Sequence, residues 1–167
     1  MRHIIHRLKW FVGLVLLQVL ILNQMHIVGY ATPFFYIYFI LKINTGTGRN
    51  ELMLWAFSLG LAVDVLGNTP GMNAAAATFF AFSRNTILRL VTLRYEEEGF
   101  NPGIKTLGLF PFFRYALLSC GMFCAVLLLI DTFSFFALST LLLKILTSTI
   151  STLICMMCAE SIGGKKE

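Results

Sequence analysis

Two charged residues interrupt long apolar stretches of this chain and are the first candidates for chemistry. Asp64 stands near the end of an apolar run, and Lys144 lies in the middle of the last one. A charge at the centre of a membrane-spanning helix costs about 2.5–3.5 kcal/mol on insertion scales, so it usually has a partner or a function. Such groups could relay protons or ions, pair with each other, or stabilise the fold.

The residues that follow Asp64 favour a structural role for its carboxylate. Gly67, Pro70 and Gly71 predict a tight turn, and Asn73 stands where the next helix begins. At ~1.5 Å per residue, Asp64 lies only ~5 Å from that turn. A helix N-terminus attracts anions by about 0.3–1 kcal/mol, and Asn73 could share its free amides. We predict that Asp64 caps the following helix or contacts a partner; proton or ion transport is the alternative.

Lys144 belongs to a polar stripe on the last helix. The hydroxyl residues that share its helix are Thr140, Thr147, Ser148, Ser151 and Thr152. Spacings of three and four place most of them on one face, which should point to the bundle or a partner. A direct pair with Asp64 stays open, because Lys144 lies ~16 Å into its helix and a snorkelling side chain recovers part of the difference in depth.

The helix after the turn is rich in alanine, including Ala77 and Ala81. Small residues let membrane helices approach closely, so we predict internal packing, with partner binding as the alternative. Arg84 and Arg89, further along this helix, are expected to snorkel toward the cytoplasmic face.

Other chemistry finds little support in the sequence. It contains no Ser-His-Asp set, no phosphate-binding glycine loop and no cluster of metal ligands. The four cysteines lie in predicted helices and are interpreted as packing residues: Cys120, Cys124, Cys155 and Cys158. We therefore expect no enzymatic activity, no cofactor and no metal.

Composition places the chain in the membrane. Of its 167 residues, 57% are hydrophobic and only 13% are charged, with a mean hydropathy of +0.80. A soluble domain has about 25% charged residues. The net charge of +5 does not indicate nucleic acid, because the basic residues flank apolar runs instead of forming a patch.

The apolar runs predict an all-α integral membrane protein, a compact bundle of six transmembrane helices in a single domain, residues 1–167. The first run is interpreted as an uncleaved helix, although it resembles a signal peptide. The expected helices span residues 10–28, 33–43, 51–66, 73–93, 112–130 and 133–158.

Lysine and arginine are distributed asymmetrically between the two sides of this six-helix map. Twelve of the thirteen lie in the terminal segments and in the segments around residues 42–49 and 84–114, while the alternate turns near 29–32, 67–72 and 131–132 contain none. The positive-inside rule then places both termini in the cytoplasm.

Residues 60–73 also carry a resemblance. The sequence Gly-Leu-Ala-Val-Asp from Gly60 to Asp64, the turn with Gly67, Pro70, Gly71 and Asn73, the alanine-rich helix and the Pro-Phe-Phe-Tyr stretch from Pro33 resemble the MreD family of rod shape-determining proteins. The resemblance implies a fold similar to the substrate-binding subunits of energy-coupling-factor vitamin transporters. Lys144 has no counterpart in that pattern.

The resemblance implies a non-enzymatic scaffold in the bacterial cytoplasmic membrane, within the machinery for cell shape and lateral cell-wall elongation. The implied partners are MreC most directly, then MreB and RodA with its class B penicillin-binding transpeptidase. The alternative function is a substrate-binding subunit of a vitamin transporter. Helix 10–28 argues against that alternative, because it contains no alanine for the Ala-xxx-Ala docking pattern typical of such subunits.

Overall fold

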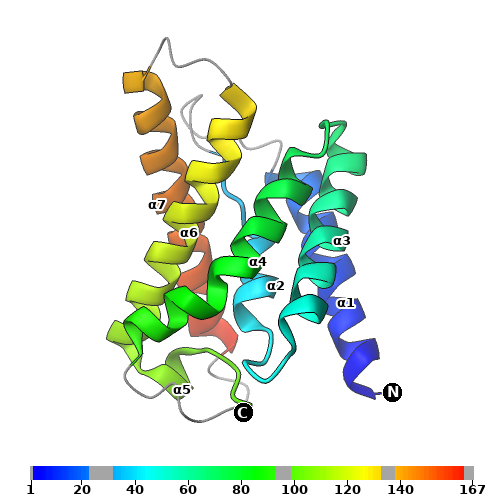
Figure 1. Cartoon of the computed structure of the whole chain (residues 1–167), viewed down its shortest axis with the longest axis vertical. Helices are drawn as coiled ribbons and strands as arrows, with labels where there is room; N and C mark the ends of the chain where they lie inside the picture. Colours follow the sequence, from blue (N-terminus) through cyan, green and yellow to red (C-terminus); the bar gives the residue numbers. More distant parts are fainter. Residues whose placement is uncertain (1, 23–31, 93–98, 133–137, 164–167) are drawn as a thin grey trace.

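The computed structural model describes residues 2–22, 32–92, 99–132 and 138–163, and these residues form helices and no strand. Figure 1 shows the helices in chain order. Their bounds are α1 (Arg2–Leu17), the π-helical η1 (Gln18–Leu22), α2 (Ile37–Lys42), α3 (Arg49–Gly67), α4 (Met72–Val91), α5 (Ile104–Leu107), α6 (Leu109–Thr132) and α7 (Leu138–Gly163).

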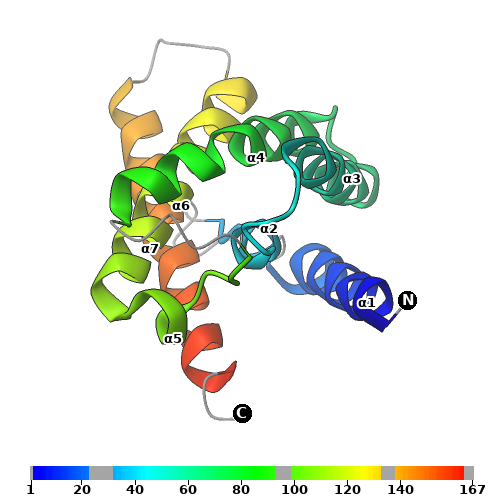
Figure 2. The ribbon, with the colours of Figure 1, turned by 60° about the horizontal axis from the view of Figure 1, so that its bottom comes forward.

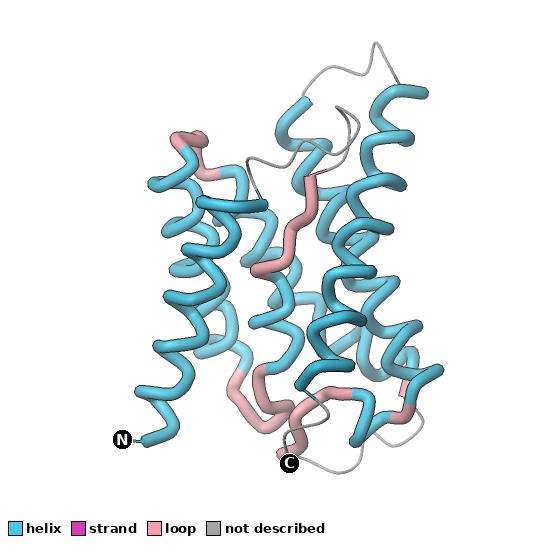
Figure 3. The backbone as a smooth tube through the Cα atoms, turned by 180° about the vertical axis from the view of Figure 1, so that it is seen from behind, coloured by secondary structure: helices cyan, strands magenta, loops and turns pink. Residues whose placement is uncertain are grey.

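Three helices are long and apolar enough to cross a membrane: Arg49–Gly67, Leu109–Asp131 and Ser139–Ser161. This is consistent with a membrane protein. The start of α1 and the last turn of α7 lie at one end of the bundle, and the α3–α4 turn lies at the other (Figures 1 and 3).

Several helices differ in length from the sequence prediction. The first begins at Arg2 instead of residue 10, and the end of the predicted span 10–28 falls in residues 23–31, outside the described chain. The last continues to Gly163 instead of ending at 158, while its predicted start at 133–137 is not described. The short helix α5 lies between the predicted helices 73–93 and 112–130.

The predicted spanning helix 33–43 is wrong in its extent. Residues 32–34 are not helical, and α2 has only six residues. At ~1.5 Å per residue this helix is ~9 Å long, against about 30 Å for the hydrocarbon core.

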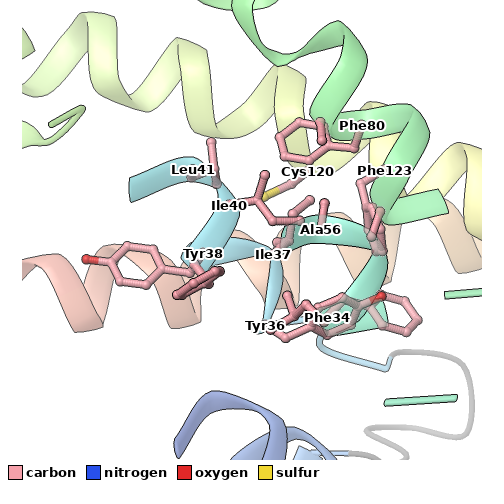
Figure 4. Packing of buried hydrophobic residues seen from close by; sticks show 14 of the residues in the cluster. Phe34, Tyr36, Ile37, Tyr38, Ile40, Leu41, Ala56, Phe80, Cys120 and Phe123 are labelled. Carbon is pink, nitrogen blue, oxygen red and sulfur yellow. The ribbon is translucent and has the colours of Figure 1, made fainter. Parts of the chain in front are cut away.

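The short helix α2 occupies the centre of the bundle, with the longer helices around it (Figure 2). Its first five residues, Ile37 to Leu41, are buried. Phe123 of α6 packs edge-on against Phe34 and Tyr36, with ring centroids 5.9 and 5.6 Å apart (Figure 4). Non-helical backbone at membrane depth is tolerated where protein surrounds it, which this core provides.

Candidate functional site

The carboxylate of Asp64 accepts four hydrogen bonds at the junction of α3 and α4. Its Oδ1 accepts the Thr69 hydroxyl, the Asn73 amide at 3.1 Å and the Asn73 side chain at 2.8 Å. Its Oδ2 accepts the Ala74 amide at 2.8 Å. Asp64 is 2% exposed, so these bonds replace its contact with water. Asp64 therefore caps the N-terminus of α4, the structural role that its turn predicts.

Asn73 lies inside α4 and is not its N-cap residue, which is Gly71. Its side chain donates to Asp64 and accepts a hydrogen bond of 2.9 Å from the Tyr36 hydroxyl. Tyr36 immediately precedes α2 and is fully buried. Asn73 thus connects the α3–α4 junction to the central segment, a link that the sequence prediction lacked.

The turn itself uses the residues expected of it. Asn68 ends α3 in the left-handed conformation with φ of 52°, and Gly71 has φ of 79°. Gly67 is the last residue of α3, and Pro70 is exposed at the tip. Together they reverse the chain so that Asp64 faces the first amides of α4.

Gly60 marks the closest approach of α3 and α4. A Cβ atom built on Gly60 would lie 2.5 Å from the Cα of Ala74 and 2.6 Å from the carbonyl oxygen of Asn73. Ala77 and Ala81 continue the contact side of α4 and are buried in the core. These small residues therefore pack inside the bundle.

Lys144 is half-buried on α7. Among the described residues, no ion pair joins it to Asp64, whose oxygens are held by the α4 junction. The polar stripe of α7 divides: Thr140 is exposed, whereas Ser148 and Thr152 are buried. Lys144 does not contribute to the candidate site.

The buried part of the stripe binds the non-helical segment 32–35. Thr152 Oγ1 accepts the Phe34 amide at 3.0 Å, and Ser148 Oγ accepts the Thr32 amide at 3.3 Å. From the other side, the Gln18 side chain accepts the Phe35 amide and donates to the Pro33 carbonyl, both at 2.9 Å. Side chains thus satisfy backbone groups that no helix satisfies.

We expect Gln18→Leu to destabilise the protein by about 1–3 kcal/mol, since it removes the side-chain partner of a partly buried amide and of a buried carbonyl. Thr152→Val removes the acceptor of the Phe34 amide and a 2.7 Å bond to the Ser148 carbonyl, which belongs to a helix. It leaves one non-helical backbone group without its partner instead of two, so its effect should be smaller. Heating the purified variants in detergent and measuring the fraction that stays monodisperse checks both. Leu20→Gln, at an exposed position of the same segment, is the control; a Gln18→Leu protein as stable as wild type would contradict the assignment.

Arg84 does not snorkel to the membrane surface, contrary to the prediction. It is fully buried, and its Nε donates to the Tyr115 hydroxyl at 3.1 Å. Its Nη2 donates to the carbonyl oxygens of Leu41 and Ile43, at the end of α2. A cation at a helix C-terminus is favourable, so Arg84 stabilises the short central helix at the end opposite Tyr36.

Glu160 is a buried acidic residue that the sequence prediction missed. Its Oε1 pairs with Lys42 Nζ at 2.8 Å and accepts the Ile104 amide at 3.1 Å, while Oε2 accepts the Tyr38 hydroxyl. The cluster therefore joins α7 to α2, through Tyr38 and Lys42, and to the start of α5, through Ile104. A lone glutamate just after an apolar run, with Lys42 at the end of another, was the available signal.

We expect Glu160→Gln to cost about 1–3 kcal/mol, because three donors lose a charged acceptor. Lys42→Met should cost less, since the Lys42 side chain is 34% exposed and can be hydrated. The double variant should cost less than the sum of the two, because both changes remove one shared contact. Unfolding free energies of the four proteins in mixed detergent measure this coupling, and strict additivity would contradict it.

A cavity of about 490 Å³ lies beside the Asp64 junction. It is bounded by η1, the segment 32–34, the α3–α4 turn and the C-terminal end of α6. Its lining residues are Val19, Thr32, Phe34, Leu66, Gly67, Thr69, Met72, Asn73, Leu127, Leu128 and Asp131.

Within the described ranges, no group of three or more histidine, cysteine or acidic side chains could hold a metal ion. No family model, curated protein or solved structure matches the chain.

Proposed function

We propose that the chain is a non-enzymatic scaffold in the bacterial cytoplasmic membrane, acting in cell shape and lateral cell-wall elongation. The observation that carries the proposal is how the polar groups inside the bundle are used. Asp64, Arg84 and Glu160 each bind backbone groups of the protein itself. Such contacts make a rigid body whose outer faces are available to other proteins.

The resemblance of residues 60–73 to the MreD family adds support, because those residues form one junction. Asp64, Asn73 and Gly60 lie in direct contact across α3 and α4. The partner that we propose first is MreC, followed by MreB and RodA with its class B transpeptidase. Six membrane-crossing segments, of which residues 32–43 are only partly helical, with both termini in the cytoplasm belong to the same proposal, and the charge asymmetry supports it.

Site-specific photocrosslinking in cells tests the scaffold. Leu146 on α7 and Leu61 on α3 are exposed and face away from the core, so a crosslinker at either position should leave the fold intact. We expect one helix face to capture MreC and the other to capture lipid. Depletion in a rod-shaped host should also give rounded cells. Failure to capture MreC from any outer face, together with unchanged cell shape, would refute the scaffold.

The second candidate is a substrate-binding subunit of a vitamin transporter. The cavity beside the Asp64 junction favours it, because about 490 Å³ is within the ~300–1,000 Å³ range of small-molecule sites. Mass spectrometry of the purified protein distinguishes this candidate: it requires a vitamin retained at close to one molecule per chain.

A further inference from the structure

The cavity beside the Asp64 junction has an uneven charge distribution. The charged side chain among its described lining residues is Asp131, near the end of α6. The same described lining contains no lysine, arginine or histidine. Among the described lining residues, a ligand group close to Asp131 therefore meets a carboxylate with no basic side chain beside it.

Helix ends add to this negative potential. Leu66 and Gly67 line the cavity at the C-terminus of α3, and Leu127, Leu128 and Asp131 line it near the C-terminus of α6. A helix C-terminus carries roughly −0.5 of an elementary charge. Among the described lining residues, the helix N-terminus at the cavity is that of α4, whose amides at Asn73 and Ala74 are already bound by the Asp64 carboxylate. An anion would find little compensation there.

The rest of the lining is suited to a small organic molecule. Phe34, Leu127 and Val19 offer apolar surface, while Thr32 and Thr69 offer polar groups. We propose that this cavity binds a small organic ammonium compound, with its charged nitrogen near Asp131 and its apolar body against Phe34 and Leu127. The proposal does not depend on the scaffold function, since a rigid scaffold can have this site or lack it.

Three compounds with one indole body and different charges test the proposal directly. Tryptamine is a cation, tryptophol is neutral and indole-3-acetate is an anion. Saturation-transfer NMR with the full chain in detergent should rank their affinities in that order, with tryptamine at least about tenfold tighter than indole-3-acetate. Equal affinities, or the reverse order, would overturn the proposal.

Asp131→Asn removes the negative charge of the carboxylate while keeping the shape of the cavity, so it tests the charge alone. Asp131 is exposed, so the change should not affect folding. We expect it to weaken tryptamine binding about tenfold and to leave tryptophol unchanged. Glu51→Gln, which alters a carboxylate in the first turn of α3 at the other end of the bundle, is the matched control. Unchanged tryptamine affinity in Asp131→Asn would refute the proposed role of Asp131.

Filling the cavity tests the location of the site. Leu127→Trp should abolish binding of both tryptamine and tryptophol. If that variant does not fold, Val19→Phe, which fills the cavity from the side of η1, should have the same effect. Tryptamine binding that persists in a folded variant of either kind would place the amine elsewhere and overturn the proposal.

The ammonium group could belong to a soluble amine or to a lipid headgroup. Nanodiscs of phosphatidylglycerol, with and without phosphatidylethanolamine, distinguish the sources when the wild type is compared with Asp131→Asn in each. If phosphatidylethanolamine competes with tryptamine for binding to the wild type but not to Asp131→Asn, the site belongs to a lipid headgroup. If the two proteins differ in tryptamine affinity and phosphatidylethanolamine leaves this difference unchanged, the site belongs to a soluble amine. If the two proteins bind tryptamine equally in both membranes, the proposed site is refuted.

Discussion

Gly60→Ala is expected to destabilise the protein by about 1–3 kcal/mol, even though alanine is the best helix former. The added Cβ would lie 2.5 Å from the Cα of Ala74 and 2.6 Å from its amide nitrogen. These are backbone atoms, which cannot rotate away as a side chain can. α3 and α4 must therefore separate, and the hydrogen bonds of Asp64 to the Asn73 and Ala74 amides lengthen with them. Gly60→Leu should be more damaging still.

Gly13→Ala is the matched control for this prediction. Gly13 is also helical, and a Cβ there would meet nothing within 4 Å. The change should be neutral or stabilise the protein by about 0.5–1 kcal/mol, through helix propensity alone. Heating both variants in detergent and following monodisperse protein compares them. A Gly60→Ala protein at least as stable as Gly13→Ala would show that the helices are not in close contact.

Asp64→Asn should destabilise the protein, and Asp64→Leu should destabilise it more. All four groups that face the carboxylate are donors: the Thr69 hydroxyl, the Asn73 side chain and the amides of Asn73 and Ala74. Asparagine can keep three of these bonds with one oxygen, but its NH₂ group would then face the Ala74 amide, a donor against a donor. We expect about 1–3 kcal/mol of destabilisation for Asp64→Asn.

Asp64→Leu removes every acceptor and leaves the first amides of α4 buried without partners, so it should exceed Asp64→Asn by at least about 1 kcal/mol. Unfolding free energies, and co-purification of the proposed partner MreC normalised to the amount in the membrane, measure the two variants. Val65→Leu, an exposed change one residue away, is the control. If Asp64→Asn and Asp64→Leu are equally damaging, the charge itself is required, and a structural cap alone is not enough.

The Asp64 junction could be predicted because its parts are close in sequence. A carboxylate three residues before a helix end, followed by a glycine-rich turn, can reach the next helix, and this can be inferred without any knowledge of the remaining fold. The contact of Asn73 with Tyr36 could not be predicted in this way. It joins residues that are 37 positions apart, and nothing in the local pattern specifies it.

The prediction that Arg84 snorkels was wrong for a reason that the local sequence does not contain. An arginine toward the end of an apolar helix usually extends to the membrane surface. Here the carbonyl oxygens of Leu41 and Ile43 lie within reach, because α2 ends inside the bundle. Only the packed arrangement of the helices reveals that buried acceptors compete with water for this guanidinium group.

The sequence by itself determined the helical, membrane-compatible character of the chain, since apolar length and scarce charge are properties of each segment alone. It also determined the turn after Asp64 through Asn68 and Gly71. The tertiary structure decided that residues 32–35 remain non-helical, because Gln18, Ser148 and Thr152 supply the partners for their backbone. Those side chains come from helices at opposite ends of the chain, and a buried segment can leave the helical conformation only where such partners meet.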